Sequence, residues 1–155
     1  MRMARATIPP RLARWPLRVA MRLSCSDGST VGTVHGSEGQ GAGMFLEAMG
    51  SAGKDGDGPY RAESYDAAAL ITLAMQAGGD ATKEAVAANV LAVANAPGEK
   101  IYPGELAKAL QILADGGEVD YEGATGVELI GPGEAAGSYR EYEVQDGAFE
   151  TIKFR

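Results

Sequence analysis

The sequence predicts an α/β domain in which helices lie on a sheet and a β-hairpin ends the chain. Segments with helical spacing of apolar residues fill the middle of the chain, and the spacing becomes strand-like after about residue 117. Near the C-terminus, Asp146-Gly147 indicates a two-residue hairpin turn, because both central positions of that turn favour positive φ. Helices followed by a terminal hairpin indicate an α/β or α+β domain, and 155 residues are the usual size of one domain.

The first part of the predicted domain is dominated by small residues. Residues 26–43 are rich in glycine, serine and threonine, so we predict a loop, with a short strand over residues 31–34 as an alternative within it. Residues 44–49 have the composition of a short helix, which the glycines of residues 50–53 end.

The most apolar helix is predicted over residues 65–77. Ser64 is its expected N-cap, and Asp66 lies in the first turn, where the helix dipole favours an anion. Residues 67–75 are apolar almost all round, so we expect this helix to be buried on most sides.

Two more helices and three strands complete the predicted domain. The helices cover residues 82–94 and 103–114, and each carries an apolar stripe at helical spacing. The strands are predicted over residues 127–130, 138–144 and 148–154, the last two joined by the Asp-Gly turn. No internal repeat is evident.

Charge is distributed unevenly along the chain. Six arginines and no acidic residue precede Ser26, whereas all 21 acidic residues and eight basic ones follow. We interpret residues 1–30 as a basic, unstructured leader. Two alternatives stay open: an unusual export signal, although arginines interrupt its apolar part, and a nucleic-acid-binding arm, although the acidic body would repel phosphates. We expect no nucleic-acid partner.

Residues that carry catalysis or metal binding are sparse. Cys25 and His35 are the only residues of their kinds, so neither an intramolecular disulfide nor a four-ligand zinc site can form. No serine lies in a G-x-S-x-G motif, and the glycines between residues 36 and 43 do not match the dinucleotide fingerprint. Asp120 and Glu122 flank a tyrosine and are interpreted as a solvated strand edge. We therefore expect no enzyme, no metal and no cofactor; a small enzyme is the weakest alternative.

A candidate ligand site precedes the apolar helix. Tyr60, Glu63 and Ser64 place an aromatic ring, a carboxylate and a hydroxyl at a helix N-terminus, where backbone N–H groups attract the carboxylate of a small zwitterion. The alternative is an ordinary helix cap with aromatic packing.

Several short motifs resemble one family in their order. Residues 58–70, GPYRAESYDAAAL, are similar to a stretch of amino-acid-binding receptors of ABC importers, in which an aromatic loop and Tyr-Asp-Ala open a buried helix. Later segments follow in the order of that family: ANAPGE, YPGE, DYEGATG and GSY. Residues 31–155 thus resemble the C-terminal part of a periplasmic substrate-binding protein of type I, similar to leucine- or branched-chain amino-acid-binding proteins.

The resemblance implies a receptor fold of two α/β lobes that binds an amino acid or amide in its cleft and delivers it to the membrane subunits of an ABC importer. It implies a periplasmic location; since no convincing signal peptide is present, the chain as written would be cytoplasmic. Only Tyr60 matches an aromatic position of the family's cleft.

Such receptors are more than twice this length, so we expect a truncated receptor that lacks most of its ligand cleft and binds amino acids weakly or not at all. Exposed strand edges would then favour self-association. The alternative function is a residual α/β interaction module that self-associates or binds a protein partner, with no transport role.

Overall fold

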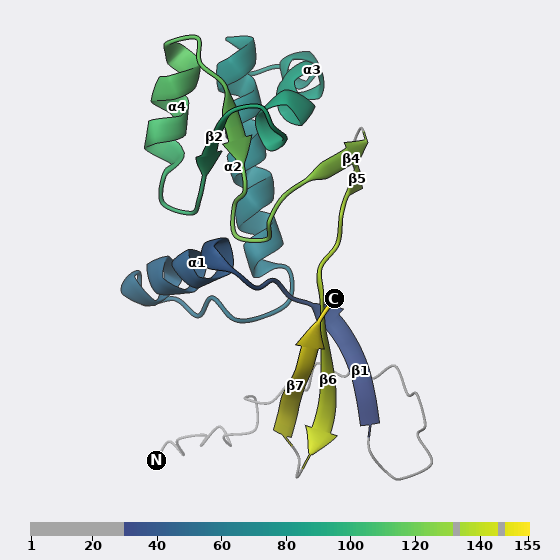
Figure 1. Ribbon diagram of the computed structural model, residues 1–155. Helices are drawn as coiled ribbons and strands as arrows, with labels where there is room; N and C mark the ends of the chain where they lie inside the picture. The colour runs from purple at the N-terminus through teal and green to yellow at the C-terminus, as the bar shows by residue number, and fades with distance from the viewer. Residues whose placement is uncertain (1–29, 132–133, 146–147) are drawn as a thin grey trace, which may run out of the picture.

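The computed structural model describes residues 30–131, 134–145 and 148–155. In these ranges four helices and three small sheets form a mixed α/β structure that ends in a β-hairpin, which confirms the predicted fold class (Figure 1). The predicted leader, apart from Thr30, and the Asp146-Gly147 turn lie outside the described residues. The elements are α1 (Gln40–Ser51), α2 (Arg61–Gly78), α3 (Lys83–Ala94), α4 (Leu106–Ala114), β1 (Thr30–His35), β2 (Glu99–Ile101), β3 (Val119–Tyr121), β4 (Leu129–Gly131), β5 (Glu134–Ala135), β6 (Tyr139–Gln145) and β7 (Ala148–Phe154).

Helix α1 begins earlier than the composition predicts. The short strand predicted over residues 31–34 is confirmed by β1, but the prediction of a loop up to residue 43 is wrong, because α1 begins at Gln40. Gly41 shows why a glycine lies inside this helix. It is buried, and a Cβ at this position would overlap the carbonyl oxygen of Gly123. Here glycine serves the close approach of two backbones, not chain flexibility.

Helix α2 starts at Arg61, so Ser64 is not its N-cap. The N-cap is Tyr60, in the left-handed conformation (φ 63°, ψ 8°), and the Ser64 hydroxyl donates a hydrogen bond back to the Tyr60 carbonyl at 2.6 Å. A serine in the first turn commonly bonds to the carbonyl four residues earlier in this way.

The expected burial of α2 on most sides is also wrong. Leu73 and Ala74 are fully buried, but Ile71 is 45% exposed and Ala67 and Ala68 are exposed. The described elements cover one face of α2 and leave the other open.

The hydrophobic core lies where α2, α3 and α4 pack against the parallel pair β2–β3. Its largest fully buried side chains are Leu73, Val93, Ile101, Val119 and Tyr121. Burying one large aliphatic side chain stabilises a fold by about 1.5–3 kcal/mol. Strands β2 and β3 were not predicted, because three residues each are too few to show an alternating pattern.

Strands β1, β6 and β7 form an antiparallel sheet in that order. His35 pairs with Tyr139 in the β1–β6 ladder, and Gln145 pairs with Ala148 at the end of the β6–β7 hairpin. Figure 1 shows this sheet at the opposite end of the chain fold from α3 and α4, with α1 between them. None of the helices within the described ranges combines the length and the apolar character that a membrane span requires.

Candidate functional site

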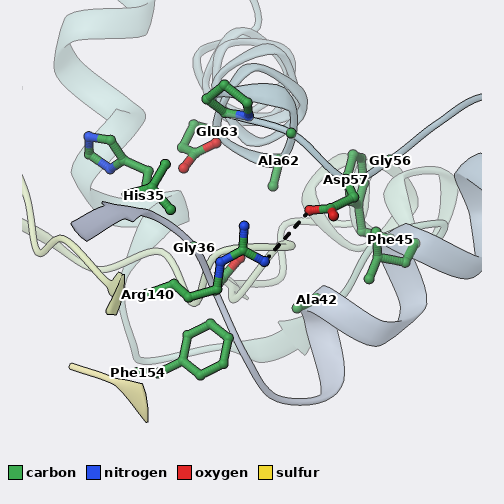
Figure 2. A pocket seen from close by; sticks show the side chains of 15 residues that line it. His35, Gly36, Ala42, Phe45, Gly56, Asp57, Ala62, Glu63, Arg140 and Phe154 are labelled. Carbon is green, nitrogen blue, oxygen red and sulfur yellow. Dashed lines mark ion pairs between the residues drawn. The ribbon is translucent and has the colours of Figure 1, made fainter. Parts of the chain in front are cut away.

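Two cavities lie where the end of β1, the start of α2 and the final strands meet. Cavity 1 has a volume of about 310 Å³ and lies between β1, α1 and the loop before α2 (Figure 2). Cavity 2 has a volume of about 330 Å³ and lies between α2, β4 and the segment that leads into β6. Both volumes are at the lower end of the range for small-molecule sites.

A shared wall separates the two cavities. It consists of four residues that line both of them: His35, Gly36, Ser37 and Glu63. The first three continue from the end of β1, where the Gly36 N–H still donates to the Ser138 carbonyl at 3.4 Å. The chain is thus held by strand-type pairing where it passes between the cavities.

Charged side chains line cavity 1. The Arg140 guanidinium lies 3.9 Å from an Asp57 carboxylate oxygen, and both residues line the cavity (Figure 2). Glu63 has no ion-pair or hydrogen-bond partner for its carboxylate in the described ranges of the chain.

Two tyrosine rings pack against His35. Its ring centroid lies 5.1 Å from that of Tyr60 and 5.0 Å from that of Tyr139, and both pairs are tilted. These contacts join the start of α2 to the β1–β6 ladder. The two rings therefore help to fix the position of His35 in the shared wall.

Asp66 is the buried polar centre beside cavity 2. It is only 2% exposed and accepts hydrogen bonds from four groups: the Tyr121 hydroxyl, the Ala124 N–H, and the N–H and hydroxyl of Thr125. Burial, together with the neighbouring Asp66 carboxylate, raises the pKa of Tyr121 well above its usual range. Asp66 therefore acts through tertiary contacts between α2 and the turn after β3, and not mainly through the helix dipole.

The structure separates the three predicted ligand residues. Glu63 lines both cavities. Tyr60 is 60% exposed, packs on His35 and lines neither cavity, and Ser64 is exposed and also lines neither. Of the three predicted residues, only Glu63 thus lines the cavities, where its neighbours differ from the predicted ones.

Sequence reasoning missed His35, Asp57 and Arg140 as parts of this site. His35 stands out in the sequence only as the single histidine of the chain. Nothing in the sequence relates Arg140 to a loop more than 80 residues earlier. Asp120 and Glu122 lie away from both cavities and pair with Lys100.

Comparison with known proteins gives one substantial similarity. Over 94 residues, which are 60% of the chain, the sequence is 37% identical to a Halobacterium salinarum protein named "Chemotactic signal transduction system substrate-binding protein BasB". The chain spans 23% of the length of that protein. No family model and no solved structure matches the chain.

This similarity corrects the expected family. The assignment to leucine-like or branched-chain receptors of ABC importers is wrong, because the similar protein is a substrate-binding protein of chemotactic signal transduction. The motifs behind that assignment are short turns and helix starts, such as Tyr-Asp-Ala, which mark local structure more than a particular kind of receptor. What the comparison supports is similarity to a substrate-binding protein over 60% of the chain.

Proposed function

We propose that residues 31–155 are part of a solute-binding domain, which holds a small molecule of the amino-acid or amide class without covalent chemistry. The observation that carries the proposal is the pair of adjoining cavities with Glu63 in their shared wall. The similarity to a substrate-binding protein over 94 residues supports it.

The lining of the cavities suits a solute with a polar head and an apolar body. Cavity 1 carries the charged side chains of Asp57, Glu63 and Arg140. Cavity 2 carries apolar side chains on its walls, among them Leu70 and Leu129. Small-molecule sites commonly combine such apolar walls with a few polar groups that orient the ligand.

Weak binding is part of the proposal. The chain spans 23% of the length of the similar protein, so further parts of a receptor would supply more contacts. We expect millimolar dissociation constants for the isolated chain, because a solute that stays half-exposed loses much of its possible interaction energy.

A nuclear magnetic resonance titration tests the proposal. Amino acids and their amides, added to 50 mM, should shift the backbone amide signals of Gly36, Ser37 and Glu63. Ala67→Phe should abolish these shifts by filling cavity 2, whereas Ala68→Phe, at an exposed neighbour outside the cavities, should not. Absent shifts, or shifts that Ala67→Phe leaves intact, would contradict the proposal.

The proposed role extends to a partner and a location. A solute receptor delivers its ligand to, or signals through, a membrane protein, which for this chain is an importer or a signalling receptor. A periplasmic location belongs to the same proposal.

One observation favours the alternative of an interaction module. On β7, Phe149 is 73% exposed and Ile152 is 50% exposed, and large exposed apolar side chains favour association. Light scattering separates the two functions: a receptor domain stays monomeric up to millimolar concentration, whereas an interaction module forms dimers that Phe149→Ser and Ile152→Ser weaken.

A further inference from the structure

We infer that the shared wall of the two cavities selects a cationic head group, so that the preferred solute is an organic amine with an aliphatic body. This inference rests on the proposed function and concerns the charge of the solute. It predicts that a carboxylate on the solute is dispensable.

The charges around the cavities leave one carboxylate unbalanced. Arg140 faces Asp57 across cavity 1 at 3.9 Å, so these two charges offset each other. Asp66, in cavity 2, is surrounded by its four hydrogen-bond donors. Glu63, which lines both cavities, has no such partner among the described residues, so its negative charge is available to a solute.

A tyrosine ring in cavity 2 strengthens the preference for a cation. Tyr139 lines cavity 2 together with Glu63, and its ring packs against His35 of the shared wall. The face of a tyrosine ring attracts an ammonium group, and a carboxylate gains nothing from it. Cavity 2 therefore combines the Glu63 carboxylate with the Tyr139 ring, and both favour positive charge.

A solute carboxylate has no comparable partner. At the Arg140 guanidinium it competes with Asp57, and in cavity 1 it also meets the negative charge of Glu63. Like charges at short range repel each other, so the carboxylate of a zwitterion costs binding energy here. The aliphatic body, in contrast, can lie against Leu70, Val127 and Leu129 in cavity 2.

Three probes with the same six-carbon chain test the inference at pH 7.5: hexylamine, norleucine and hexanoate. They present a cation, a zwitterion and an anion, respectively. We expect hexylamine to bind about tenfold more tightly than norleucine, and hexanoate to produce no shifts, in the same magnetic resonance titration. Norleucine binding as tightly as hexylamine, or hexanoate binding, would overturn the inference while leaving the proposed function intact. If none of the probes, amino acids or amides binds, both fail.

Two variants assign the effect to its residues. Glu63→Gln should weaken hexylamine binding by roughly three- to tenfold, as expected for the loss of one partly exposed charge pair. Glu84→Gln is the matched control, because Glu84 also lies in the first turn of a helix but lines neither cavity. Asp57→Asn should release Arg140 and strengthen norleucine binding relative to hexylamine. Unchanged hexylamine binding by Glu63→Gln would refute the role of this carboxylate.

Discussion

The buried carboxylate of Asp66 makes the sharpest prediction about stability. Asp66 accepts hydrogen bonds of 2.9 Å from the Tyr121 hydroxyl, 2.9 Å from the Ala124 N–H, and 2.9 and 2.7 Å from the N–H and hydroxyl of Thr125. These bonds tie α2 to the turn that follows β3, more than 50 residues later in the chain. The substitution Asp66→Ala removes the acceptor of all four.

The expected cost is large because the donors stay behind. A hydrogen bond to a charged group contributes about 1.5–3 kcal/mol, and each buried donor left without a partner costs about 1–3 kcal/mol. Some of the freed donors will reach water, so we expect Asp66→Ala to lower the free energy of unfolding by about 3–5 kcal/mol. The free energy of unfolding of a small domain is about 5–15 kcal/mol, so the variant should be close to unfolding.

Urea denaturation followed by circular dichroism measures this cost. Asp57→Asn is a suitable control, because Asp57 is exposed and its loose ion pair should change the free energy of unfolding by less than about 1 kcal/mol. Tyr121→Phe removes a single donor and should cost about 1–2 kcal/mol. If Asp66→Ala cost less than 1 kcal/mol, the hydrogen-bond network would not hold α2 to the turn, and the reasoning would be refuted.

Three further predictions concern packing, pH and salt. Gly41→Ala should destabilise the protein by about 2 kcal/mol or more, because its Cβ would overlap the Gly123 carbonyl. Gly43→Ala should stabilise α1 by up to about 1 kcal/mol, because its Cβ would point into open space. Urea midpoints compare the two variants, and equal effects would contradict the close approach of Gly41 to Gly123. Since the folded-state pKa of Tyr121 is raised, the contribution of its protonated hydroxyl to the free energy of unfolding is complete below the unfolded pKa of about 10 and is lost as the pH rises above it. The free energy of unfolding should therefore fall more steeply between about pH 10 and 11.5 in the wild type than in Tyr121→Phe. Finally, the net charge of −7 predicts that 1 M NaCl raises the urea midpoint by screening repulsion between acidic residues, and a lower midpoint would argue that attractive ion pairs dominate.

Helix α3 and the terminal hairpin show what local sequence signals can determine. The helix was predicted within one residue of its bounds, and Thr82, just before it, accepts a hydrogen bond from the Ala85 N–H at 3.3 Å as a helix cap does. Strands β6 and β7 lie where the alternating pattern on both sides of Asp146-Gly147 predicts them. In both cases the signal and the structure it specifies lie within a few residues of each other.

The candidate site shows what local signals cannot determine. Tyr60, Glu63 and Ser64 are neighbours in sequence, and the prediction treated them as one site. In the folded chain only Glu63 faces the cavities, where it meets His35 from β1 and Arg140 from β6. Because α2 begins at Arg61 and not at Tyr65, these three side chains lie inside or next to the helix and point in different directions from one another. No residue near them specifies where the sheet will lie.

The amino-acid sequence by itself determined the α/β class, the position of α3 and the terminal hairpin, because caps, turns and periodicity act over a few residues. Only the tertiary structure decided that glycine-rich residues form the start of α1, that Asp66 ties α2 to the turn after β3, and that Glu63 lies between two cavities. The physical reason is the same in each case. The Gly41–Gly123 approach, the hydrogen bonds of Asp66 and the cavity walls join residues that lie far apart in the sequence, and such contacts exist only once the chain has folded.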